Sequence, residues 1–160
     1  MRYPLPIPLP RGIISGIGLP DEHRIDFPSF RSACELAANT MRGSVREIHE
    51  ANSGDVLTYY HEATIVYDFG RRSVRVLCSA FYPVIAFADA GASRSSRILN
   101  FVDVPALASA LGENLHFVIM TAAEATKPPA SPLIDALDET EKQEIQLLQP
   151  QRLGDAVFKR

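Results

Sequence analysis

Residues 59–81 constrain the fold more than any other stretch, because they hold two alternating patterns separated by a turn. Residues 59–69 and 72–81 each place apolar side chains on one side of an extended chain. Gly70 suits the first central position of a two-residue type II′ turn, which needs a positive φ, so the turn is centred on Gly70 and Arg71. The predicted pairs are Tyr67 with Val74, Ile65 with Val76, Ala63 with Cys78, and His61 with Ala80. An antiparallel hairpin with one core face follows.

The flanking residues predict an α+β fold. A helix is expected from Ser29 or Phe30 to Arg42, with Gly43 at its C′ position. Further strands are expected at 45–50, 84–89, 98–102 and 115–120, with helices starting after 103, at 121–124 and over 138–148. Residues 21–160 therefore predict a single domain, an antiparallel meander of five to six strands with helices packed on one face.

Residues 1–20 form a separate, proline-rich segment. Prolines at positions 4, 6, 8 and 10 forbid a helix and favour an extended N-terminal arm. Extended segments can add to sheet edges, so this arm is a candidate contact with a partner or with a second copy in a homodimer.

Composition and charge restrict the classes of function. The 160 residues carry a net charge of −3, so we expect neither nucleic acid nor a membrane as a general partner. The longest apolar run, residues 76–88, is shorter than the roughly 20 residues that span a bilayer. Cys34 and Cys78 form no C-x-x-C motif, which predicts buried reduced thiols and no metal site. We also expect no cofactor. We expect a cytoplasmic protein.

One set of side chains is a candidate acid/base site, and its assembly depends on the loop that joins the first two strands. A three-residue loop pairs Glu47 with Tyr59 and places His49 on the same face as His61. A four-residue loop turns Ile48 to the core and leaves Glu47 and His49 in solvent. We favour the second arrangement, because burying an unpaired carboxylate costs more than exposing an isoleucine. His61 is then a lone polar group near the core.

Acidic residues gather on or near the first two strands, and they are the candidate contact surface for a basic protein partner. Such charge complementarity chiefly raises association rate and specificity. The candidates are Glu47, Glu50, Asp55, Glu62 and Asp68. Arginines follow at 71, 72, 75, 94 and 97, without the interleaved aromatics of RNA-reading sheets.

Two short stretches resemble small bacterial α+β proteins of the immunity or antitoxin type. These are Asn100-Phe101-Val102-Asp103-Val104-Pro105 and residues 149–158. The resemblance implies a non-catalytic protein that neutralises a toxin or effector by stoichiometric binding, and it transfers no particular binding residue. Two alternatives stay open: a small enzyme centred on His61, and a carrier of a small apolar ligand. The carrier pocket would lie under Tyr67, Val76, Ile85 and Phe87.

Overall fold

A computed structural model describes most of the chain from Asp26 onward. The described residues are 26–51, 59–81, 83–90, 99–115, 117–128, 137, 139–148, 150 and 152–158, with only the backbone at 113–115, 144 and 148. The proline-rich arm and Asp55 lie outside them.

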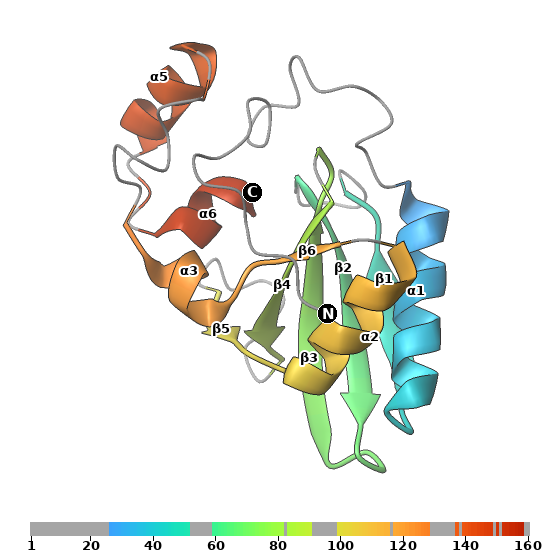
Figure 1. Ribbon diagram of the computed structural model, residues 1–160. Coiled ribbons are helices and arrows are strands. Elements are labelled where there is room, and N and C mark those ends of the chain that lie inside the picture. Colours follow the sequence, from blue (N-terminus) through green and yellow to red (C-terminus); the bar gives the residue numbers. More distant parts are fainter. Residues whose placement is uncertain are drawn as a thin grey trace.

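The described chain folds into a sheet with helices around it (Figure 1). In chain order the elements are α1 (Phe27–Thr40), β1 (Ser44–His49), β2 (Tyr60–Tyr67), β3 (Arg72–Ser79), β4 (Val84–Asp89), β5 (Phe101–Val102), α2 (Pro105–Leu115), β6 (Val118–Ile119), α3 (Ala122–Thr126), α5 (Glu139–Leu148) and α6 (Leu153–Val157). The strand order β1-β2-β3-β4-β5 confirms the predicted α+β meander. Two features were not predicted: the short helix α6, and the parallel pairing of β6 with β4.

Both faces of the sheet bury apolar side chains, whereas the sequence predicted helices on one face only. The face that carries Ile65, Val76 and Phe87 packs against α1 and α2. The opposite face carries Tyr60 and Leu77, and α3 and α6 contribute to its core. This opposite face therefore lacks apolar packing only where polar side chains take the place of the second core.

The β2–β3 hairpin confirms the predicted strands and their core face, but its register is two residues from the predicted one. The observed pairs are Tyr67 with Arg72, Ile65 with Val74, Ala63 with Val76, and His61 with Cys78. The backbone N–H of Arg71 donates to the carbonyl oxygen of Asp68 at 3.2 Å, so Phe69 and Gly70 are the central turn residues. Gly70 thus occupies the second central position. Because a shift of two keeps every side chain on its face, the predicted core survives the error.

A β-bulge sets the pairing of β1 with β2, and both predicted registers were wrong. Val45 pairs with Ile65 and Glu47 with Thr64, which leaves Arg46 as the extra residue. Val45 and Ile48 both reach the core side, although they are three positions apart. The favoured arrangement of faces is confirmed: Ile48 lies on the core side, with Glu47 turned away from it.

Helix α1 ends in a Schellman motif that brings two backbone segments together. The N–H of Gly43 donates to the carbonyl of Ala38 at 2.8 Å, and Arg42 takes the left-handed conformation with a φ of 56°. Gly43 therefore lies one position later than predicted. A Cβ atom there would lie 2.1 Å from the carbonyl oxygen of Val66, so β2 requires glycine at this point.

Both cysteines are buried and free, as predicted: Cys34 on the buried side of α1, and Cys78 on the face of β3 that packs in the same core. Within the described ranges, the helices are too short or too polar to cross a bilayer.

Candidate functional site

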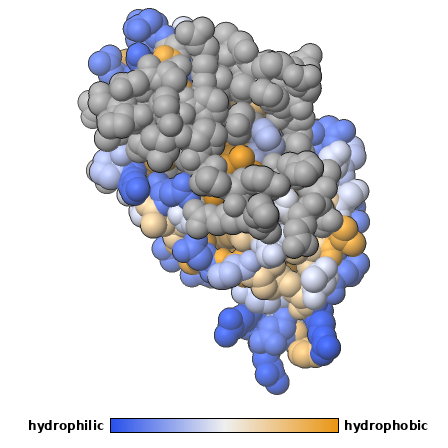
Figure 2. Space-filling view, in the orientation of Figure 1, coloured by the Kyte–Doolittle hydropathy of each residue, from blue (hydrophilic) through white to orange (hydrophobic). Residues whose placement is uncertain are grey.

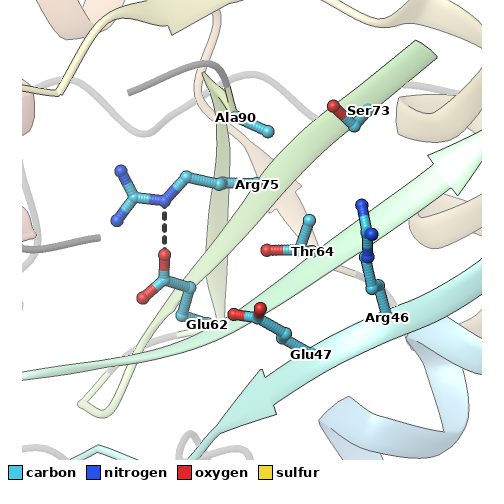
Figure 3. Close-up of a pocket in the computed structure, with 7 residues that line it drawn as sticks. All are labelled: Arg46, Glu47, Glu62, Thr64, Ser73, Arg75 and Ala90. Atoms are coloured by element: carbon cyan, nitrogen blue, oxygen red, sulfur yellow. Dashed lines mark hydrogen bonds and ion pairs between the residues drawn. The ribbon is translucent and has the colours of Figure 1, made fainter. Parts of the chain in front are cut away.

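A polar pocket lies on the sheet face opposite α1 and α2 (Figure 3). Its volume is about 340 Å³, at the lower end of the range of small-molecule sites. The lining residues come from three adjacent strands and the end of β4: Arg46, Glu47, Glu62, Thr64, Ser73, Arg75 and Ala90. This is the part of the second face where charged and hydroxyl side chains take the place of the apolar core.

A buried ion pair forms part of the pocket wall. The Arg75 Nε atom donates to Glu62 Oε1, and the two side chains are only 3% and 5% exposed. The pairing follows from the register: Arg75 lies opposite Thr64, so Glu62 is its diagonal neighbour on the same face. Removing either charge would leave the other buried without its counter-ion, which is strongly destabilising.

Three buried nitrogen atoms on this face have no hydrogen-bond partner. They are Arg75 Nη1, Arg75 Nη2 and His49 Nε2, and the described part of the chain contains no other buried side-chain nitrogen or oxygen in this state. His49 lies opposite Glu62 in the β1–β2 pairing. Its Nε2 atom is 3.7 Å from Glu47 Oε2, which is too long for a hydrogen bond. The unused hydrogen-bonding capacity of the described residues is thus concentrated beside the Arg75–Glu62 pair.

The bulge of β1 brings two opposite charges to the rim of the pocket. Arg46 is the extra residue of the bulge, and Glu47, with a side chain 59% exposed, follows it. Among the residues that the structure describes, no carboxylate forms an ion pair with Arg46. The rim therefore offers one cation and one anion to solvent.

The predicted acid/base residues do not come together. His61 lies on the face covered by α1, where its Nδ1 atom accepts a hydrogen bond from the N–H of Ala51 at 2.9 Å. Its ring packs against Phe27 and Phe30, with centroid distances of 5.4 and 5.8 Å. His49 is on the opposite face of the sheet. Tyr59 precedes β2, and its ring lies 5.9 Å from that of Phe81.

The predicted acidic residues occupy different environments. Glu47 and Glu62 share the pocket, but the carboxylate of Glu62 is buried and paired with Arg75. Glu50 directly follows β1, and Asp68 lies at the turn that ends the β2–β3 hairpin. Asp55 lies outside the described residues. Across the described ranges, no three His, Cys, Asp or Glu side chains are grouped closely enough to hold a metal ion.

A second surface feature lies at the tip of the β2–β3 hairpin, which extends beyond the ends of α1 and α2 (Figure 1). Phe69 at this tip is 71% exposed and has a φ of 55°. The Arg42 Cζ atom lies 5.7 Å from the centre of its ring, and Arg71 and Arg72 are exposed on the other side of the turn. In Figure 2 this end of the molecule is mostly hydrophilic with an apolar spot in it. The sequence predicted a turn here but gave no sign that its aromatic residue would project.

No protein-family model, curated protein or solved structure matches this chain.

Proposed function

We propose that this chain is a non-catalytic protein-binding module of the immunity type, which neutralises a bacterial toxin or effector by stoichiometric binding. The observation that carries the proposal is the hairpin tip, where Phe69 projects into solvent among arginines. The immunity-type role is inferred from the resemblance of residues 100–105 and 149–158 to proteins of that kind.

The conformation of Phe69 supports a role in recognition. A bulky residue in the left-handed region costs about 1–3 kcal/mol, and an asparagine or glycine would avoid that cost. Phe69 also places an apolar ring in water, so neither turn formation nor core packing accounts for it. A partner protein that buries the ring would account for this exposed phenylalanine.

The residues around the ring indicate the chemistry of the partner surface. Aromatic and arginine side chains dominate the binding energy of many protein interfaces. Here Arg42 lies over the ring of Phe69, and the exposed Arg71 and Arg72 follow in the same hairpin, with Asp68 directly before the ring. The complementary surface is an apolar pocket with an acidic rim.

The arrangement of the candidate catalytic groups supports binding over catalysis. Nucleophilic and acid/base catalysis need groups within hydrogen-bond reach of one another. His61 and His49 instead lie on opposite faces of the sheet, and the pocket wall is an arginine–carboxylate pair.

Affinity capture with matched variants tests the proposal. The immobilised protein, Phe69→Asn and Leu147→Asn are exposed to the same lysate, and bound proteins are quantified by mass spectrometry. Leu147 is the control, because it is an apolar residue 85% exposed on a different element. We expect a partner that is retained by the wild type and Leu147→Asn and lost by Phe69→Asn. Native mass spectrometry should then give a 1:1 complex.

The immunity-type role is tested with the captured partner in purified form. Addition of one equivalent of this protein should abolish the toxic or enzymatic activity of the partner, and one equivalent of Phe69→Asn should not. A partner whose activity is unchanged when it is fully bound contradicts neutralisation. Equal capture by all three proteins contradicts recognition through the hairpin tip.

The acidic residues remain a separate prediction about the contact surface. Glu47→Lys and Glu50→Lys should slow association at low salt if a basic patch of the partner docks there. An unchanged association rate would assign the contact to the tip alone.

A further inference from the structure

We propose that His61 is an acid-sensitive switch, and that protonation of its ring releases Ala51, two residues after β1, from β2. His61 belongs to β2 and lies on the face of the sheet that α1 covers. The switch is separate from the hairpin tip, and it does not depend on the protein-binding function.

One hydrogen bond carries the proposal. The backbone N–H of Ala51 donates to His61 Nδ1 at 2.9 Å. A backbone amide nitrogen can only donate, so Nδ1 is the acceptor and carries no proton. A charged imidazole carries a proton on both ring nitrogens, and two N–H groups would then face each other across this contact. The hydrogen bond therefore forms only with neutral His61, and protonation breaks it.

The surroundings of the ring add to the cost of a charge. His61 is only 6% exposed, and its ring packs against Phe27 and Phe30 at centroid distances of 5.4 and 5.8 Å. Burial among apolar groups disfavours the charged form of a histidine. Since both phenylalanines belong to α1, a ring that moves toward water would also loosen the packing of β2 against this helix.

Two carboxylates near the switch favour the charged ring, and both residues are exposed. Asp26 attracts a positive charge at His61, but its side chain also caps α1, where it accepts a hydrogen bond from the N–H of Ser29 at 2.9 Å. Glu50 directly precedes Ala51 in the chain. Solvent screens exposed charges, so these attractions are weaker than the combined effect of burial and the lost hydrogen bond.

The other titratable groups in this core are thiols. Cys78 pairs with His61 across the β2–β3 hairpin, and Cys34 packs in the same core from α1. Burial raises the pKa of both thiols, so they carry no charge at neutral or acid pH. Of these three side chains, His61 is the one that titrates between pH 5 and 8.

The direction of the pH effect follows from the neutral ring. An unfolded histidine takes up a proton near pH 6.5, whereas the folded state must break the contact with Ala51 to do so. Below pH 6.5 the unfolded state therefore binds more protons, and stability is lost as the pH falls. The unfolding equilibrium constant should rise by up to about 25-fold between pH 7 and pH 5.

The test follows the full chain from pH 8 to pH 5 by ¹H–¹⁵N NMR. The ring ¹⁵N shifts of His61 report the proton on Nδ1, and the backbone amide of Ala51 reports the hydrogen bond. We expect Nδ1 to be unprotonated at pH 8. The Ala51 amide should then lose its protection from hydrogen exchange with the same midpoint as the ring, below pH 6.5.

Two variants separate the switch from a general effect of acid. His61→Asn keeps a hydrogen-bond acceptor but has no group that titrates in this range, so its stability in urea should be nearly constant between pH 7 and pH 5. His49→Asn removes a histidine from the opposite face of the sheet and should keep the wild-type pH dependence. Phe69→Asn should keep it too, so this proposal and the one at the hairpin tip fail independently.

A ring midpoint at or above pH 6.5 in the folded protein, or the same pH dependence in the wild type and His61→Asn, would overturn the proposal. An Ala51 amide that stays unchanged while the ring titrates would do so as well. If His61→Asn does not fold, the wild-type ring and amide titrations decide the question by themselves.

Discussion

Arg42, Asp68 and Phe69 are the non-glycine residues of the described chain with a positive φ, and two different turns place them there. Arg42 completes the Schellman motif of α1, while Asp68 and Phe69 form the end of the β2–β3 hairpin. The ring contact between Arg42 and Phe69 brings these turns together. The strained backbone is therefore concentrated at one end of the molecule.

The turn after α1 gives a matched pair of predictions. Arg42→Gly should raise the free energy of unfolding by about 0.5–1 kcal/mol, because glycine adopts the left-handed conformation without a steric penalty. Gly43→Ala should lower it by about 2 kcal/mol or more, because the new methyl group would collide with the carbonyl oxygen of Val66. Urea denaturation monitored by circular dichroism measures both. Equal effects of the two substitutions would contradict this assignment of positions.

Burial controls the chemistry of the Cys34 thiol. Desolvation, with a smaller contribution from Glu35, raises the pKa of Cys34 from 9.0 to about 12. Between these two values the unfolded thiol loses its proton and the folded one keeps it, so this group's contribution to stability is lost as the pH rises from 9 toward 12. The loss is at most about 1.4 kcal/mol for each pH unit.

We therefore expect alkylation of Cys34 by iodoacetamide at pH 8 to be far slower in the native protein than in urea. Cys34→Ala should show a shallower decline of stability above pH 9 than the wild type. Rapid native-state alkylation would place the thiol outside the core.

At the scale of elements, the alternation of apolar and polar side chains along the β2–β3 hairpin could be predicted from the sequence, but the pairing register of its strands could not. The pattern of residues 59–81 fixes which side chains face the core, and this was predicted correctly. The register depends on which turn residue takes which φ, and the prediction assigned the first central position to Gly70 because that position of a type II′ turn needs a positive φ. The observed turn instead gives Phe69 a φ of 55° and Gly70 a φ of 83°.

The pocket was missed because the bulge that builds it was missed. A regular strand would place Val45 and Ile48 on opposite faces, yet both are apolar. Two apolar residues three apart in a strand are the signal of an inserted residue, and here that residue is Arg46. The buried pair of Glu62 with Arg75 followed from the register and was therefore also missed.

The bulge predicts an asymmetry between two single-residue deletions. Deletion of Arg46 leaves Val45, Glu47 and Ile48 in regular alternation, so we expect a folded protein whose stability changes by no more than about 1 kcal/mol. Deletion of Val45 moves Arg46 into the place opposite Ile65 and should destabilise much more. Thermal unfolding of the two variants measures the difference. Similar melting temperatures would contradict the pairing described for β1.

At the scale of the whole molecule, the sheet is shared by two cores, and part of this was visible in the sequence. All residues of β4 before Asp89 are buried, and such a continuous apolar run indicates burial on both faces. The partner of the second face could not be predicted, because α6 is only five residues long and has a weak pattern. Its contacts with Phe101 and Ala125 join segments that are far apart in sequence.

Gly154 tests how strongly α6 is held against the second core. A Cβ atom at this position would lie 2.4 Å from Phe101 Cζ and 3.1 Å from Ala125 Cβ. Gly154→Ala should therefore lower the free energy of unfolding by about 1–3 kcal/mol despite the better helix propensity of alanine. Ala123→Ser, at an exposed position of α3, is the matched control and should have little effect. A stabilised Gly154→Ala would show that α6 can move away from Phe101.

The bulge in β1 also has a consequence for self-association. Within the described residues β1 pairs with β2 alone, so its other side carries backbone groups that a strand from a second molecule could use. An extra arginine and a local break in the ladder make that side a poor template for cross-molecular growth. By this reasoning, deletion of Arg46 would make β1 a regular strand and would also make the protein more prone to aggregate at high concentration.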